Sequence, residues 1–275
     1  MSQVEVHHGA ATDVGLVRAV NEDSYLSAPP VFVVADGMGG HQGGDVASRI
    51  VVEEFARVAD EGYDPRRGAD VIAATLRDIQ GRIEQYAAAQ RAKSGEDFQA
   101  GTTAVVGLLV EDDEGAKWLL ANLGDSRIYR YAAGSLEQVS VDHSVVQELV
   151  DAGSITREEA AVHPARHVIT RALGGAEFAD ADYFLLPLPQ VERLLLCSDG
   201  INGMIDDAQI AEILGRTGDA QDAADRLVAA ALDAGGRDNA TAVVVDVVQA
   251  EEGPDAAGRR PVADEQDEQD TEEVA

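Results

Sequence analysis

Short apolar runs bounded by glycine, aspartate or asparagine are the main pattern along the chain, and they predict β-strands. Three of these runs follow one another between residues 102 and 131, with short polar turns between them. This succession favours an antiparallel meander over a strict alternation of strands and helices. The predicted strands span residues 31–35, 102–110, 117–123, 127–131, 193–197 and 242–248.

Three longer stretches carry apolar residues at spacings of three and four, the period of an α-helix with one buried face. They span residues 47–58, 72–86 and 220–231. These stripes predict a β-rich core covered by a few long helices. No run of about 18 apolar residues occurs, so the sequence predicts no membrane-spanning segment.

Two segments depart from this pattern. Residues 143–175 contain a short helical piece, and then Thr156 followed three residues later by Glu159, which resembles a helix-capping box. We interpret this segment as a small helical insertion. Residues 249–275 are acidic and nearly free of large apolar residues, which predicts a disordered tail after a single domain that spans residues 1–248.

The charge of the chain restricts its partners. The formal net charge is −30, and such a surface repels nucleic acid and anionic lipid. It could attract basic partners or divalent cations, or it could serve solubility alone. One cysteine rules out an internal disulfide and predicts a reducing compartment. Because the N-terminus also lacks the pattern of a secretory signal, we expect a cytoplasmic protein.

Four aspartates fall at the ends of predicted strands. Asp36, Asp125 and Asp199 follow apolar runs, and Asp238 lies just before one. Each of them alone is typical of a turn. Together they suggest that the strands of one sheet layer bring their carboxylates to one place, where a cation would neutralise them. Oxygen ligands favour Mg²⁺ or Mn²⁺, and two such ions could activate a water toward a phosphoester.

Two loops add candidate chemistry. The glycine-rich stretch VVADGMGGHQGG lacks the lysine of a P-loop, but Gly37 would let a backbone carbonyl approach a metal. The stretch TDVGLVRAVNED carries Arg18, whose guanidinium suits phosphate, and Asn21, Glu22 and Asp23 add oxygens. The alternative for this second loop is a polar turn with a salt bridge. Cys197 ends a buried run and is interpreted as an inert core thiol.

Six motifs in this order resemble the bacterial metal-dependent serine/threonine protein phosphatases of type 2C. The resemblance extends over roughly residues 5–248 and implies an α+β fold, an αββα sandwich of two antiparallel sheets flanked by helices. It also implies that residues 143–175 form a mobile flap. The motifs are TDVGLVRAVNED, VVADGMGGHQGG, GTTAVVGLL, ANLGDSRIYR, LLLCSDGINGMI and GGRDNATAVVV.

The resemblance implies a role for each candidate residue. The cofactors would be two core Mn²⁺ or Mg²⁺ ions and a weaker third ion. Arg18 would bind the substrate phosphate, and Asn239 would support the site from beside Asp238. Glu22 and Asp23 would hydrogen-bond metal-bound waters. The implied metal ligands are Asp36, which bridges the core ions, the carbonyl of Gly37, Asp199, Asp238, and, for the third ion, Asp125.

The implied reaction is hydrolysis of phosphoserine and phosphothreonine in proteins by a metal-activated water, without a phospho-enzyme. Some relatives carry a histidine general acid at the position of Met38, so the proton donor here is either His41 or a metal-bound water. We expect phosphoproteins as substrates, a bacterial Ser/Thr kinase among them, and a monomeric enzyme. Two alternatives are a catalytically inactive phosphoprotein binder and a phosphatase of small phosphoesters or anti-sigma-factor antagonists.

Overall fold

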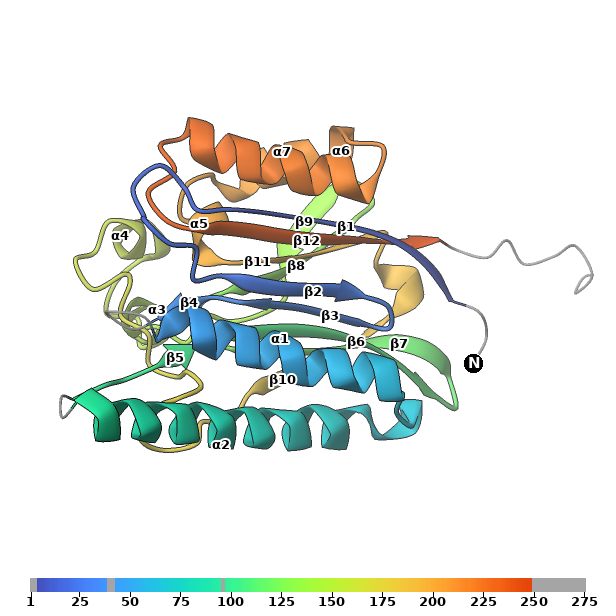
Figure 1. Ribbon diagram of the computed structural model, residues 1–275. Coiled ribbons are helices and arrows are strands. Elements are labelled where there is room, and N and C mark those ends of the chain that lie inside the picture. The colour runs from blue at the N-terminus through green and yellow to red at the C-terminus, as the bar shows by residue number, and fades with distance from the viewer. Residues whose placement is uncertain (1–3, 39–42, 95–96, 249–275) are drawn as a thin grey trace, which may run out of the picture.

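Two antiparallel sheets of five strands each lie face to face in the computed structural model, which describes residues 4–38, 43–94 and 97–248 (Figure 1). The strand order is β1-β12-β11-β8-β9 in one sheet and β10-β7-β6-β3-β2 in the other. The first sheet consists of β1 (Glu5–Asp13), β12 (Ala240–Val248), β11 (Arg193–Cys197), β8 (Arg127–Ala132) and β9 (Ser135–Gln138). The second consists of β10 (Asp182–Pro187), β7 (Gly115–Leu123), β6 (Ala104–Asp112), β3 (Val31–Ala35) and β2 (Ser24–Ala28).

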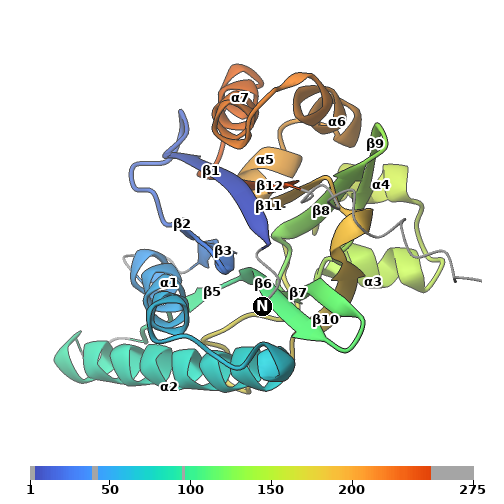
Figure 2. The same cartoon turned by 90° about the vertical axis from the view of Figure 1, so that its right-hand side faces the viewer.

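Helices cover the outer face of each sheet (Figures 1 and 2). The β2-containing sheet is covered by α1 (Gly44–Glu61) and α2 (Gly68–Ser94), and the β1-containing sheet by α5 (Asp199–Asn202), α6 (Asp207–Arg216) and α7 (Ala220–Asp233). Smaller elements complete the chain: the ribbon of β4 (Gly37–Met38) and β5 (Gly101–Thr102), the 3₁₀ turns Pro65–Arg67 and Leu188–Gln190, and the helices α3 (Val145–Asp151) and α4 (Arg157–Ala161). This architecture is the αββα sandwich implied by the resemblance.

The layers explain why the central strands are continuously apolar. In β3, Val31 and Val33 pack against α1 and α2, whereas Phe32 and Val34 point between the two sheets. Successive side chains of a strand point to opposite faces, so a strand buried on both faces has no polar alternation. Phe32 meets Trp118 of β7 edge to face in the middle layer, with ring centroids 5.7 Å apart.

The predicted elements differ from the structure in several respects. Strands β6 and β7 form the predicted antiparallel hairpin, but β8 does not continue it and lies in the opposite sheet, so the three-strand meander is wrong. The strands β1, β2, β9 and β10 were not predicted, because their partly exposed residues form no clear apolar run. The predictions for all three long helices are confirmed.

The insertion carries the capping box that its sequence predicts. Thr156 accepts a hydrogen bond from the backbone of Glu159, whose side chain accepts one from the backbone of Thr156, so α4 starts there. Among the described residues, no helix is both long enough and apolar enough to cross a bilayer. The predicted tail, residues 249–275, lies outside the described residues.

Candidate active site

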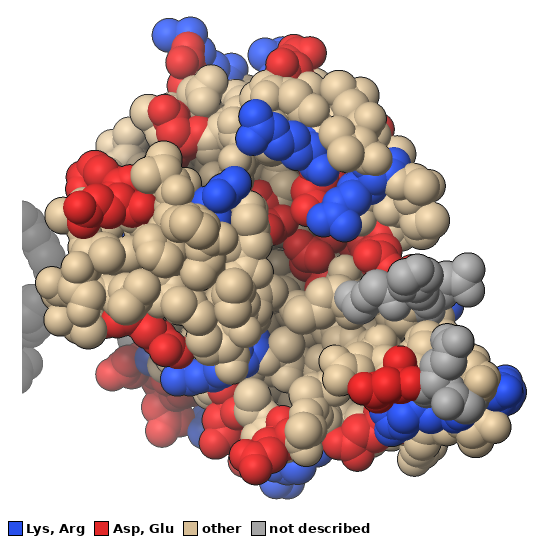
Figure 3. Space-filling model, turned by 90° about the vertical axis from the view of Figure 1, so that its left-hand side faces the viewer, with Lys and Arg blue, Asp and Glu red and all other residues tan. Residues whose placement is uncertain are grey.

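A pocket of about 680 Å³ opens at the end of the sandwich where α3 and α4 lie. Figure 3 shows a hollow with acidic side chains at its base and basic side chains at its margin. Its charged lining consists of the carboxylates Glu22, Asp36, Asp125, Asp199 and Asp238, the arginines Arg18, Arg166 and Arg237, and His167. All four aspartates at predicted strand ends are therefore brought together.

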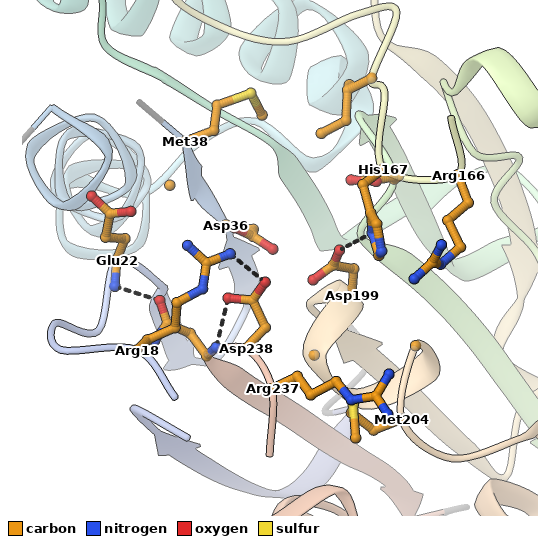
Figure 4. A pocket seen from close by; sticks show the side chains of 16 residues that line it. Arg18, Glu22, Asp36, Met38, Arg166, His167, Asp199, Met204, Arg237 and Asp238 are labelled. Atoms are coloured by element: carbon orange, nitrogen blue, oxygen red, sulfur yellow. Dashed lines mark hydrogen bonds and ion pairs between the residues drawn. The ribbon is translucent and has the colours of Figure 1, made fainter. Parts of the chain in front are cut away.

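The aspartates come from both sheets rather than from one. Asp36 follows β3 and Asp125 follows β7, two strands of one sheet. Asp199 follows β11 and Asp238 precedes β12, two neighbouring strands of the other sheet. The expectation that strands of a single sheet layer gather these residues is wrong: the site forms where the two sheets meet. Figure 4 shows the carboxylates of Asp36, Asp199 and Asp238 facing a common space.

Burial and like charge raise the pKa of three carboxyl groups at or beside this site, Asp36, Asp125 and Asp23. Desolvation is the largest cause for Asp36, whose pKa lies well above its ordinary value, and neighbouring carboxylates add to the shift. Burial raises the pKa of Asp125 to about 7, with a further contribution from Asp199. Burial likewise raises the pKa of Asp23 to about 7, although hydrogen bonds from Thr241 and Ser198 oppose the shift. Because these carboxylates repel one another, a bound cation would stabilise their charged form.

The donor set fits a hard divalent cation. The oxygen donors that line the pocket are mainly carboxylates, and Oδ1 of Asp23, which interacts electrostatically with Asp36, is buried without a hydrogen-bond partner. Within the described part of the chain, no three acidic, histidine or cysteine side chains already enclose one point. Mg²⁺ usually keeps several waters and needs only one or two carboxylates, so a closed protein cage is not required. The residues present therefore fit such an ion.

Glycine at position 37 is required by crowding of the backbone. Gly37 is buried, and a β-carbon there would overlap the backbone of Gly44 and Glu22. Its amide donates to the carbonyl of Glu22 at 3.2 Å. The glycine thus lets β4 and the start of α1 pass close beside Asp36, at the edge of the pocket.

Arg18 lies over the pocket and is held by an aspartate. Its Nη2 donates to Oδ2 of Asp238 at 2.7 Å (Figure 4). Both side chains are partly exposed, and a guanidinium carries five N–H donors, so this ion pair leaves donors free for a second anion. The structure therefore contains the salt bridge that the sequence left open as an alternative, and it also places Arg18 at the pocket.

Asn239 fastens the loop that carries Arg18. Its Oδ1 accepts from the amide of Glu22 at 2.9 Å. Its Nδ2 donates to the carbonyls of Val14 at 2.9 Å and Val20 at 3.0 Å. One buried side chain thereby holds both ends of the turn around Arg18. Asp23 continues this anchoring, since it accepts hydrogen bonds from Ser198 and Thr241, each at 2.7 Å.

Substituting Asn239→Ala is expected to lower the free energy of unfolding by about 1–3 kcal/mol, because the Glu22 amide and two carbonyls lose their partner. Urea unfolding monitored by circular dichroism measures this. Gln221→Ala is the matched control, since that side chain also bonds a backbone amide and carbonyl, both of Ala10, at an exposed site. We expect less than about 0.5 kcal/mol for the control. Equal losses for the two variants would contradict the anchoring role.

Several residues at the pocket were missed by the sequence analysis. His167 follows α4, and its Nδ1 lies 3.8 Å from Oδ2 of Asp199. Arg166, its neighbour, and Arg237 line the same pocket. No spacing or motif of the insertion marks Arg166 or His167, because only the folding of residues 143–175 over the pocket brings them there.

Cys197 and His41 are the two remaining candidates from the sequence analysis. Cys197 is completely buried and its pKa is raised to about 12 by that burial, which agrees with an inert core thiol. Met38 lines the pocket and has no proton to donate. His41, the candidate proton donor, lies outside the described residues, so its role stays a prediction.

Comparison with known proteins gives one consistent family. The model of the family described as "Protein phosphatase 2C" matches residues 18–234. The chain is 38% identical over 243 residues to "Serine/threonine protein phosphatase PstP" of Mycobacterium tuberculosis (strain ATCC 25618 / H37Rv), with 88% of this chain and 45% of that protein covered. It is 32% identical over 260 residues to "Serine/threonine phosphatase stp" of Listeria innocua serovar 6a, with 92% and 100% covered.

Solved structures agree in fold. The crystal structure of the catalytic domain of PstP in complex with two manganese ions superimposes with a TM-score of 0.75 at 36% identity, covering 89% of this chain and 99% of that one. The chain thus spans somewhat less than half the length of the mycobacterial relative and the whole length of the Listeria relative.

Proposed function

Because the chain belongs to the protein phosphatase 2C family, we propose that it hydrolyses phosphoserine and phosphothreonine in proteins in a metal-dependent reaction. The observation that carries this proposal is the gathering of four aspartates from four strand ends around one pocket, beside Arg18. The relatives named above are serine/threonine phosphatases. A phosphorylated side chain of a protein suits a pocket at the surface in which acidic groups that could hold cations lie beside basic groups that could bind phosphate.

We propose that two core ions, Mn²⁺ or Mg²⁺, bind at the pocket, and a third ion more weakly. Asp36 would serve both core ions, with the carbonyl of Gly37, Asp199 and Asp238 as further ligands, and Asp125 would belong to the third. The raised pKa values and the all-oxygen donor set support this assignment. When bound, such ions activate water and neutralise charge on a phosphoryl group.

The other residues are proposed to bind the substrate phosphate, to hold waters, or to keep the Arg18 loop in position. Arg18 is proposed to orient the substrate phosphate with the donors that Asp238 leaves free. Glu22 and Asp23 would hold waters at the site, and Asn239 keeps the Arg18 loop in place. No side-chain nucleophile is needed. His41 is one candidate for the proton that the leaving oxygen requires, because Met38 cannot supply it.

The wider assignments follow from the same proposal. The catalytic domain would span residues 1–248, with a flap at about residues 143–175, and residues 249–275 would form an acidic tail. A monomer acting in the cytoplasm on phosphoproteins, a Ser/Thr kinase among them, is proposed. The net charge of −30 disfavours nucleic acid and anionic membranes as partners.

Hydrolysis of p-nitrophenyl phosphate tests the proposal directly. The native protein is expected to be active with Mn²⁺ and inactive after EDTA. Arg18→Ala is expected to raise KM about 10- to 100-fold, since a charge-assisted hydrogen bond is worth roughly 1.5–3 kcal/mol. Arg67→Ala is the matched control, because Arg67 also pairs with an aspartate, Asp70, but lies outside the pocket.

Each result has a distinct meaning. If the native protein shows no Mn²⁺-dependent hydrolysis, the proposed activity is wrong. If Arg18→Ala behaves like Arg67→Ala in steady-state kinetics, the activity stands but the phosphate contact of Arg18 is wrong.

A further inference from the structure

Three large apolar side chains are exposed on the loop between β1 and β2. Leu16 and Val17 are each 69% exposed as whole residues, and Val20 is 59% exposed. We call these three residues the apolar rim. They flank Arg18 on both sides in the sequence. Three large apolar residues exposed within a five-residue stretch of one loop form a candidate interaction surface.

The rim is exposed although its backbone is firmly held. The amide of Leu16 donates to the carbonyl of Gly236 at 2.7 Å. The carbonyls of Val14 and Val20 both accept from Asn239, and the amide of Gly15 donates to Asp13 at 2.8 Å. These bonds fix the loop while its apolar side chains stay in water. A surface ordered in advance loses little conformational entropy when a partner covers it.

The rim is continuous with the mouth of the pocket. Leu16 approaches Gly236, whose neighbour Arg237 lines the pocket. Arg18, between Val17 and Val20, reaches over Asp238 into the same pocket (Figure 4). In Figure 1 the loop lies at the end of the sandwich where the α3 and α4 segment also lies. An extended peptide advances about 3.3 Å per residue, so side chains a few positions from a phosphate at Arg18 come within reach of the rim.

We propose that the apolar rim is a docking surface for the phosphoprotein substrate and takes an apolar side chain within about three residues of the phosphorylated one. This inference rests on the proposed function and adds a substrate preference to it. The net charge of −30 disfavours an anionic membrane as the occupant. The continuity with the catalytic pocket favours the substrate over a second copy of the chain.

A leucine scan tests the inference. The substrates are seven-residue phosphothreonine peptides of glycine, serine and alanine, in which one leucine is moved through the six positions around the phosphothreonine. The native protein is compared with the triple variant Leu16→Ser, Val17→Ser, Val20→Ser, and p-nitrophenyl phosphate serves as a reference substrate that carries no peptide. The matched control is Phe178→Ser, Tyr183→Ser, Leu185→Ser, three exposed apolar residues that do not line the pocket.

For the native protein, kcat/KM is expected to be about five- to tenfold higher with leucine in at least one position than without leucine, from the apolar area buried. The rim variant should lose this preference and keep its kcat/KM for p-nitrophenyl phosphate within about twofold, whereas the control variant keeps both.

Other results overturn the inference. They are a native protein without leucine preference, a rim variant that retains the preference, or a native dimer in analytical ultracentrifugation that the rim variant converts to monomer. The last result would assign the rim to a second copy. Absence of all Mn²⁺-dependent hydrolysis by the native protein would instead overturn the proposed function, and this inference with it.

Discussion

Asp36→Asn is expected to lower kcat/KM for p-nitrophenyl phosphate with Mn²⁺ by about 10³-fold or more. Asp36 lines the pocket with the other three aspartates, and in the proposed site an amide would not replace a negatively charged ligand of two cations. This factor corresponds to a loss of several kcal/mol of transition-state stabilisation by the metal, since each 1.36 kcal/mol of activation free energy changes the rate tenfold. Steady-state kinetics over a Mn²⁺ titration measures the change.

The same variant has a second readout that is independent of catalysis. In EDTA at pH 8, Asp36→Asn should unfold at a higher temperature than the native protein, because a neutral amide removes repulsion from the carboxylates around it. Added Mn²⁺ should stabilise it less than the native protein. Asp60→Asn, an exposed position on α1, is the control and should change neither quantity. Turnover like that of the native protein would refute the two-ion assignment.

Without metal, the protein is expected to lose stability as the pH rises from 5 to 8. The folded pKa of both Asp23 and Asp125 is about 7, against an ordinary value of 3.8, mainly because of burial. The folded state therefore binds more protons than the unfolded state in this interval. The stability from these groups is fully present below about pH 4 and is lost as the pH passes through about 7.

Calorimetry in EDTA measures this effect. A loss of a few kcal/mol corresponds to a drop of about 5–10 °C in Tm for a domain of this size. Saturating Mn²⁺ should flatten the dependence, because the cation supplies the positive charge that protons otherwise provide. Asp125→Asn should reduce the slope, whereas the exposed Asp113→Asn should not. A Tm in EDTA that is constant or rises between pH 5 and 8 would contradict the assignment.

The central strands and long helices were predictable because their patterns are local. A strand buried on both faces, such as β3, is apolar throughout, and a helix with one buried face has apolar residues at spacings of three and four. The partly exposed strands could not be predicted from the local sequence, because their extended conformation depends on backbone pairing with a neighbouring strand. β1, for example, pairs along its whole length with β12, more than 220 residues away in the chain.

The sequence by itself determined the set of candidate residues for the chemistry. Asp36, Asp125 and Asp199 follow apolar runs, Asp238 precedes one, and Arg18 and Asn239 stand in recognisable motifs. These residues can be found locally, because each aspartate lies in the sequence beside the apolar run of its strand. The order of the motifs then sufficed to indicate the family and its fold.

Only the tertiary structure decided how these residues meet. It placed β8 in the opposite sheet, brought the aspartates together from two sheets, and put Arg166 and His167 of the insertion at the pocket. It also showed that Asn239 holds both ends of the Arg18 loop while Leu16, Val17 and Val20 stay exposed. These features depend on contacts between segments far apart in the chain, where packing and desolvation act, and no local pattern of residues records them.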